Sequence, residues 1–137
     1  MLHKINFYTS ETSTIDWLPD YRAVLFTQSG RNEGLLLQES LNAGLDCLNQ
    51  KKTKKWISDN RNLISFRGTE DSDWLESDWV PRAVKAGWKY WALVQPEKIY
   101  MNLVYDRISE LFQKFGVEVM IFSNLEDAFV WIQSIKD

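Results

Sequence analysis

The chain has 137 residues, of which 45% are hydrophobic and 26% are charged, a length and composition typical of one folded domain, here residues 1–137. Sixteen Lys and Arg residues against nineteen Asp and Glu residues give a net charge of −3, so no electrostatic case exists for binding nucleic acid or an anionic membrane. The single cysteine, Cys47, excludes an internal disulfide and a cysteine zinc cluster. Polar and apolar residues mix within the first ten positions, so we expect a cytoplasmic protein without a signal peptide or membrane span.

The histidine count limits the possible chemistry further. His3 is the only histidine, and it lies near a chain end, where order is commonly lowest. A Ser/His/Asp or Cys/His catalytic group and a histidine-based metal site therefore lack their residues. We expect no catalytic residues, no metal and no cofactor, and only carboxylate-based chemistry stays open.

The N-terminal third predicts two strands and a helix. Ile5 and Phe7 alternate with polar residues, which is typical of a half-buried strand over 2–9. A β-branched and aromatic run predicts a second strand over 21–27, and the short connection favours antiparallel pairing. Leucines three and four residues apart then predict a helix over 33–50.

The middle of the chain predicts a basic connector, a short strand and an interrupted helix. The Lys51–Lys55 run is expected to form a solvated connector after the helix. A short strand is predicted over 56–58 and a helical pattern over 70–86. Pro81 lies inside that pattern, so we expect a kink or a break into two helices near 78–82.

The last third predicts two strands that alternate with two helices. An increasingly apolar run predicts a strand over 88–95, and apolar residues at helical spacing predict a helix over 101–116. A final strand is expected over 117–122, and Asn124 can cap a last helix that runs to about residue 135.

This order of elements, ββαβαβαβα, predicts an α/β fold. We expect a mixed, mostly parallel sheet of about five strands, flanked by about four helices. The first strand is the expected sheet edge, and pairing across it would give a homodimer.

Four local strings together point to a known family. They are Lys54–Leu63, Trp74–Arg82, the Ala86-Gly87 turn before a Trp-rich strand, and Phe122–Ile132. These strings resemble the SpoIIAA-like branch of the STAS/SEC14 domains, over about residues 20–135. The resemblance implies a STAS-like α/β domain with a non-enzymatic regulatory or protein-interaction role, such as that of an anti-sigma-factor antagonist. It also implies an alternative, a small-molecule or lipid-binding domain of SEC14-like type, because that branch uses an apolar pocket and this chain is rich in aromatic residues.

The resemblance further implies candidate phosphorylation sites. STAS-type antagonists are switched at a serine or threonine at the start of the helix that follows the strand corresponding to 56–58. The family's usual Asp-Ser-Ser-Gly type of string is absent here, and the hydroxyl residues in that region are Ser65, Thr69 and Ser72.

The sharpest polar cluster is Asp59-Asn60-Arg61. It follows a predicted central strand, where open α/β sheets place their ligand crevices. An acceptor, an amide and a bidentate donor could bind a polar ligand or a partner. Alternatively, Asp59 and Asn60 form a turn, and Arg61 pairs with an acidic helix residue such as Asp78.

A second candidate site is the helix flank of Trp74, Asp78, Trp79 and Arg82. Asp78 and Trp79 lie four and five residues after Trp74, and Arg82 lies four after Asp78, so the residues share one flank of the helix, which would suit an unknown protein partner if exposed. The alternative is core packing, which we expect for tryptophans on inward-facing positions. Those are Trp56, Trp79, Trp91 and Trp131.

Two enzyme-like alternatives have weak support. A carboxylate-only enzyme would use Asp59 or Asp78, but neither has a second carboxylate at a fixed spacing. A phosphate-accepting receiver domain would use Asp59 with Lys98 and needs an acidic pair after the first strand, where Glu11 is the only carboxylate.

Overall fold

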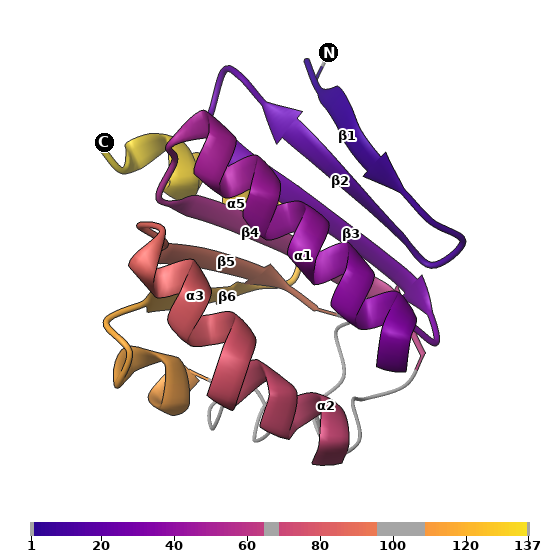
Figure 1. The fold of residues 1–137 in the computed structure, drawn as a ribbon. Helices are drawn as coiled ribbons and strands as arrows, with labels where there is room; N and C mark the ends of the chain where they lie inside the picture. The colour runs from indigo at the N-terminus through magenta and orange to yellow at the C-terminus, as the bar shows by residue number, and fades with distance from the viewer. Residues whose placement is uncertain (1, 65–68, 96–108, 137) are drawn as a thin grey trace.

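A computed structural model describes residues 2–64, 69–95 and 109–136. Its central element is a six-stranded sheet with the strand order β1-β2-β3-β4-β5-β6 (Figure 1). The elements are β1 (Ile5–Thr9), β2 (Ser13–Leu18), β3 (Ala23–Gly30), α1 (Gly34–Lys51), β4 (Lys55–Leu63), α2 (Thr69–Trp74), a π-helical segment η1 (Leu75–Trp79), α3 (Val80–Lys85), β5 (Tyr90–Val94), β6 (Glu118–Phe122) and α5 (Leu125–Ser134). Residues 109–113 are also helical.

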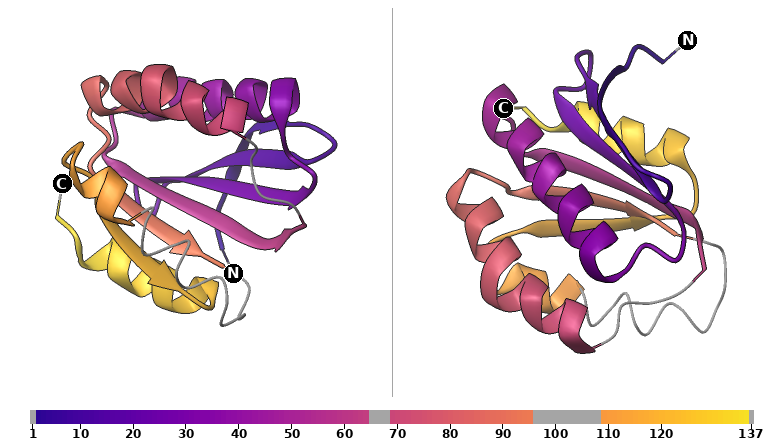
Figure 2. Two further views of the ribbon diagram at one scale, coloured as in Figure 1. Left: turned by 90° about the horizontal axis from the view of Figure 1, so that it is seen from below. Right: turned by 45° about the vertical axis from the view of Figure 1, so that its right-hand side comes forward.

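The sheet is mixed and mostly parallel. Strands β1, β2 and β3 form an antiparallel meander, whereas β3, β4, β5 and β6 pair in parallel. Helix α1 and the α2–η1–α3 unit cover one face, and α5 covers the other (Figure 2). The predicted α/β fold class is confirmed. None of the helices in the described ranges is both long enough and apolar enough to cross a membrane.

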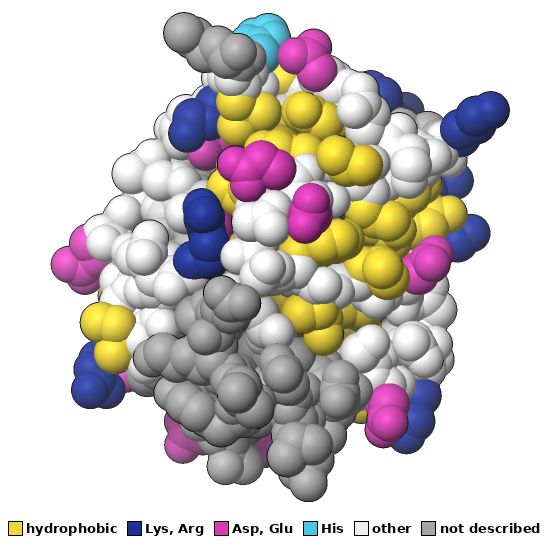
Figure 3. All heavy atoms as spheres, turned by 180° about the vertical axis from the view of Figure 1, so that it is seen from behind, with side chains coloured by type: hydrophobic (Ala, Val, Ile, Leu, Met, Phe, Trp, Pro, Cys, Tyr) yellow, Lys and Arg dark blue, Asp and Glu magenta, His cyan; other side chains and the backbone are white. Residues whose placement is uncertain are grey.

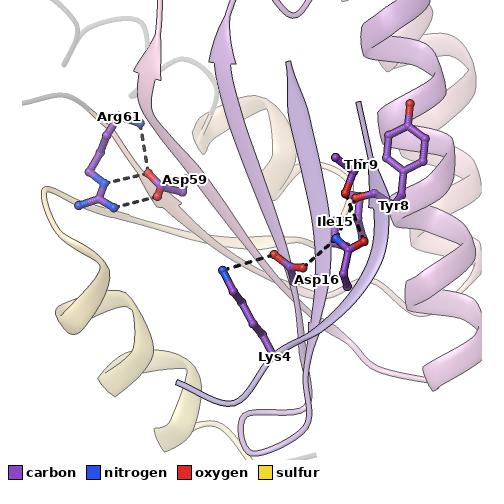
Figure 4. Close-up of polar contacts among 8 residues, drawn as sticks. Lys4, Tyr8, Thr9, Ile15, Asp16, Asp59 and Arg61 are labelled. Carbon is purple, nitrogen blue, oxygen red and sulfur yellow. Dashed lines mark hydrogen bonds and ion pairs between the residues drawn. The ribbon is translucent and has the colours of Figure 1, made fainter. Parts of the chain in front are cut away.

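Strand β2 is the element that the sequence did not predict. It alternates as a strand should, with Ile15 and Trp17 in the core beneath α1. Its opposite side carries Asp16, which is only 4% exposed. Asn6 Nδ2 donates to the Asp16 carboxylate at 3.1 Å, and Lys4 Nζ lies 4.0 Å away (Figure 4). A buried carboxylate in the middle of the strand hid its pattern.

Strand β4 is longer than predicted, because it runs through residue 63 rather than ending at Ser58. Its first residue, Lys55, is buried and donates from Nζ to the Ile135 carbonyl at 2.7 Å. The expectation that the whole Lys51–Lys55 run is solvated is therefore wrong at Lys55, which ties β4 to the end of α5.

The helix break that Pro81 predicts is present and begins slightly earlier, at Leu75. Pro81 lies in the first turn of α3, which continues directly from η1, and because it has no N–H it cannot donate a bond to the preceding turn. The Val80 N–H, one residue earlier, donates to the Leu75 carbonyl. This bond spans five residues instead of four and therefore widens this turn of the helix.

Trp56 on β4 is the centre of the core between the sheet and the helices. Its ring lies 5.7 Å from Phe26, 5.4 Å from Trp79 and 6.2 Å from Trp88, measured between centroids. Gly44 of α1 lies directly above it, because a Cβ added there would be 2.2 Å from Trp56 Cη2. The absence of a side chain at Gly44 thus sets how closely α1 approaches β4.

We expect Gly44→Ala to destabilise the protein although alanine favours helices by about 1 kcal/mol over glycine. The added methyl overlaps a fully buried indole, and overpacking costs typically about 1–3 kcal/mol. An overlap at 2.2 Å places the cost near the upper end of that range, so urea unfolding should show a net loss of about 1–2 kcal/mol after the helix preference of alanine is subtracted. Asn49→Ala, at an exposed position of the same helix, is the control and should cost nothing. A neutral or stabilising Gly44→Ala would contradict the role of this contact.

Candidate functional site

A pocket lies between the sheet and the helices that cover its α1 face. We call it the tryptophan pocket. Among the described residues it is lined by Phe26, Gln28, Asn32, Leu41, Trp56, Ser58, Asn60, Leu63, Leu75, Trp79, Trp88, Trp91, Leu93 and Phe112. The room for the centres of water-sized molecules is about 50 Å³, and the whole empty space, including the open mouth, is about 680 Å³.

The wall of the tryptophan pocket is aromatic and carries no formal charge on any described residue. Trp88 and Trp91 stack edge-on with Phe112, at centroid distances of 5.8 and 4.8 Å. The indole N–H of Trp79 donates to the Leu41 carbonyl at 2.9 Å, and that of Trp88 to the Tyr90 carbonyl at 3.3 Å. These two rings therefore present only apolar surface.

Ser58 forms one polar point in this apolar wall. It is 3% exposed, and its Oγ accepts the indole N–H of Trp56 and that of Trp91, both at 2.9 Å. One hydroxyl on β4 thus fixes both rings, that of Trp56 on the same strand and that of Trp91 on β5.

Asn60 forms the second polar point and is the end of a chain of buried amides. Asn32 Nδ2 donates to Gln28 Oε1 at 3.0 Å, and Gln28 Nε2 donates to Asn60 Oδ1 at 2.7 Å. The β3–β4 register, which pairs Thr27 with Asp59 but Ser29 with Asn62, has an irregularity here. Such a bulge redirects side chains near sites.

The predicted Asp59-Asn60-Arg61 cluster is divided between the two faces of the sheet. Only Asn60 lines the tryptophan pocket. Arg61 folds back on Asp59 (Figure 4), with Nε and Nη2 each 2.9 Å from a carboxylate oxygen. This bond raises the pKa of Arg61 despite partial burial, and the charge of Glu126 on α5 adds to the effect. The three residues belong to β4 rather than to a loop after it, so they do not form one site.

The alternative pairing of Arg61 with Asp78 is also wrong. Asp78 accepts from Arg82 Nη2 at 2.8 Å within the same helical unit, and Arg82 Nη2 also donates to Asn42 on α1. Trp74 is half-buried against the core, and Trp79 is buried. The predicted flank therefore holds α3 to α1, with Asp78 and Arg82 exposed at its rim.

Exposed apolar side chains occur away from that flank. Val130 on α5 is 69% exposed, and Met120 on β6 is 42% exposed. Figure 3 views the molecule from behind and shows hydrophobic side chains interspersed with acidic and basic ones.

The tryptophans expected in the core are largely there. Trp56, Trp79 and Trp91 are buried, whereas Trp131 is half-buried beside Phe122. Three of the four expectations are confirmed, and the fourth side chain lies at the edge of the core.

The phosphorylation candidates fall in three different situations. Ser65 lies outside the described residues, as does Lys98 of the receiver-like alternative. Thr69 is the first residue of α2, and Ser72 is exposed on the same helix. Their phosphorylation stays a prediction.

No cluster of three or more His, Cys, Asp or Glu side chains in the described part of the chain could hold a metal ion. Cys47 is buried in the core, and burial raises the pKa of its thiol to about 11, against a smaller opposite effect of Lys51. A thiol with that pKa stays protonated at neutral pH and is a poor nucleophile.

The sequence analysis missed Ser58, Gln28 and Asn32 as site residues. Ser58 is the last residue of the strand predicted over 56–58, and Asn32 lies between the strand predicted over 21–27 and the helix predicted over 33–50. A sequence signal for Gln28 was available, because it continues the alternation of Val24 and Phe26 just past the strand predicted over 21–27.

Comparison with known proteins supports the fold. No family model matches the sequence, and no curated protein matches it either. The structure is similar to that of an uncharacterized protein of the DUF3478 family with a SpoIIAA-like fold from Shewanella loihica PV-4. The TM-score is 0.57 over 96% of this chain and 93% of the other, at 12% sequence identity. The chain has a SpoIIAA-like fold, as its local strings predicted, and a likeness at this identity shows the fold alone.

Arg61 and Arg82 form matched ion pairs that differ in the burial of the carboxylate. The side chain of Asp59 is 7% exposed and that of Asp78 is 50% exposed, whereas the two arginines are similar. We expect Arg61→Ala to lower the free energy of unfolding by about 1–2 kcal/mol, because a nearly buried carboxylate loses charged donors. Arg82→Ala should cost less than about 1 kcal/mol, as exposed pairs do. Urea unfolding of both variants at pH 7 measures this, and equal losses would refute the distinction.

Proposed function

We propose that this protein binds a small, uncharged, mostly apolar molecule in the tryptophan pocket. The observation that carries the proposal is a hollow lined by four tryptophans and two phenylalanines that retains two polar points, Ser58 and Asn60. Ligand sites are typically apolar and aromatic concavities with a few placed polar groups, and this one, with about 50 Å³ for the centres of water-sized molecules, is small. This proposal corresponds to the small-molecule alternative of the sequence analysis.

The same wall argues for binding without catalysis. Its described residues include no carboxylate, imidazole, amine, guanidinium or thiol, the groups that move protons or activate a nucleophile. The Ser58 hydroxyl accepts two indole N–H groups and has no base beside it among these residues. We therefore propose a binding domain rather than an enzyme.

The regulatory or protein-interaction role stays a prediction. Its expected surface included Asp78 and Arg82, which bind each other, and Arg82 also donates to Asn42. Ligand binding in the pocket is compatible with a protein partner and with a homodimer that pairs across β1.

Binding is tested by titrating ¹⁵N-labelled protein with butan-2-one and with its hydrocarbon analogue 2-methylbut-1-ene. We expect at least one of them to shift the indole N–H signals of Trp56 and Trp91 in a saturable way. Trp131, which packs against Tyr90 and Phe122 on the other face, should not respond.

A blocked pocket supplies the matched comparison. Leu63 lines the pocket, whereas its neighbour Ile64 is 74% exposed and does not. Leu63→Trp should weaken binding about tenfold or more, and Ile64→Trp should leave it unchanged. The proposal fails if neither molecule gives a saturable shift in the wild-type protein.

A further inference from the structure

The hydrogen-bond role of Ser58 is fixed by its two partners. An indole N–H can only donate, so the bonds from Trp56 and Trp91 use both acceptor positions of Ser58 Oγ. The hydroxyl proton of Ser58 is then the one hydrogen-bonding group that these two bonds do not use. No acceptor for it occurs among the described residues, so Ser58 offers a donor at the wall of the tryptophan pocket.

The hydrogen-bond role of Asn60 follows from a longer series of bonds that begins at the Leu37 carbonyl. The Leu37 carbonyl can only accept, and Ser40 donates its hydroxyl to it at 2.9 Å. Ser40 Oγ therefore accepts from Asn32 Nδ2, at 3.3 Å, which orients the amide of Asn32.

In that orientation Asn32 Oδ1 accepts the hydroxyl proton of Thr12, at 2.8 Å. Asn32 Nδ2 also donates to Gln28 Oε1, so Gln28 Nε2 is the group that donates to Asn60 Oδ1. The Nδ2 group of Asn60 is left as a donor, without an acceptor among the described residues, on a side chain that is 8% exposed and lines the pocket.

The tryptophan pocket thus presents donors at Ser58 Oγ and Asn60 Nδ2, each assigned through a group that can only donate or only accept. We propose that the pocket recognises a neutral ligand through a hydrogen-bond acceptor of carbonyl type, as in a ketone, ester or amide, which accepts from Ser58 Oγ and Asn60 Nδ2. This inference rests on the proposed function and adds the chemical class of the ligand.

The absence of charge from the described wall selects against a carboxylate. An ionised group that leaves water for an uncharged apolar site loses its hydration, and two neutral donors do not replace it. A hydrocarbon is disfavoured for a different reason, because it leaves both buried donors without a partner.

The size of the pocket suits a short polar group followed by a wider apolar part. About 50 Å³ of space for water-sized centres corresponds to about four water molecules. A carbonyl with one or two neighbouring carbons fits this space, and the rest of the ligand would extend toward the mouth.

Three molecules of nearly equal shape test the chemistry on the wild-type protein. They are butan-2-one, 2-methylbut-1-ene, which replaces the oxygen by a methylene, and propanoate, which replaces a methyl by a charged oxygen. Affinities are read from the Trp56 and Trp91 indole signals at pH 7. We expect butan-2-one to bind about tenfold or more tightly than either analogue, since a site with fixed donors rejects ligands that leave them unpaired.

A double variant removes the donor of Asn60 from the pocket wall. Gln28→Leu with Asn60→Leu removes two amides that bond each other, so neither is left without the other. Asn32 Nδ2 loses its Gln28 acceptor but keeps its bond to Ser40 Oγ. The variant should lose most of the preference for butan-2-one over 2-methylbut-1-ene, because only the Ser58 donor remains. Asn62→Leu, at an exposed position of β4 that does not line the pocket, is the control and should keep the wild-type order.

The outcomes separate this inference from the proposed function. Equal affinity for butan-2-one and 2-methylbut-1-ene in the wild-type protein would overturn the acceptor inference and leave ligand binding standing. Tightest binding of propanoate would overturn it as well. No saturable shift with any of the three would mean a pocket that holds only water, and both proposals would fall.

Discussion

The contact between Trp56 and Gly44 is the constraint on which the rest of the core depends. The indole fills the space beneath α1, where a Cβ at position 44 would be 2.2 Å from it. The same ring contacts Trp79 and Trp88 and donates to Ser58. One side chain therefore sets the height of α1 above the sheet, the position of the η1–α3 unit and the orientation of the hydroxyl in the pocket. The tryptophan pocket is the space that these large, poorly deformable rings leave between them.

Alternation along β4 places two kinds of polar chemistry on opposite faces of the sheet. Ser58 and Asn60 lie toward α1 and use neutral groups only, whereas Asp59 and Arg61 lie toward α5 and form an ion pair. Neutral amides can be buried at low cost once they are bonded, while a charge in the same place requires a charged partner or water. The face with the enclosed hollow carries the neutral set. The partly exposed face, where Arg61 keeps 42% of its side chain in solvent, carries the charged set.

The fold could be predicted from the sequence where the pattern of a helix or strand depends only on residues close together in the chain. Asn124, for example, accepts the Asp127 N–H at 2.8 Å as the predicted cap of α5, and Gly116 adopts a positive φ of 83° after the helix at 109–113. The site could be predicted only in part, because its geometry depends on pairing between distant strands. The sequence cannot show that β4 extends past Ser58, since the extension comes from its bonds with β3. The sequence grouped Asn60 with Asp59 and Arg61, which are adjacent to it in the chain but lie on the opposite face of the sheet.

The polarity of the amide chain has an energetic consequence for the empty protein. Donors without a partner at Ser58 and Asn60 cost about 1–3 kcal/mol each when nothing meets them. Water in a space of this size reduces that cost, at up to about 2 kcal/mol of entropy for each molecule held. A ligand that brings its own acceptor releases such water and satisfies the same donors, while its apolar part covers the tryptophan faces. The two contributions act on one molecule only when it combines a carbonyl group with an apolar body, and ligand binding then adds to the stability of the fold in proportion to the logarithm of ligand concentration.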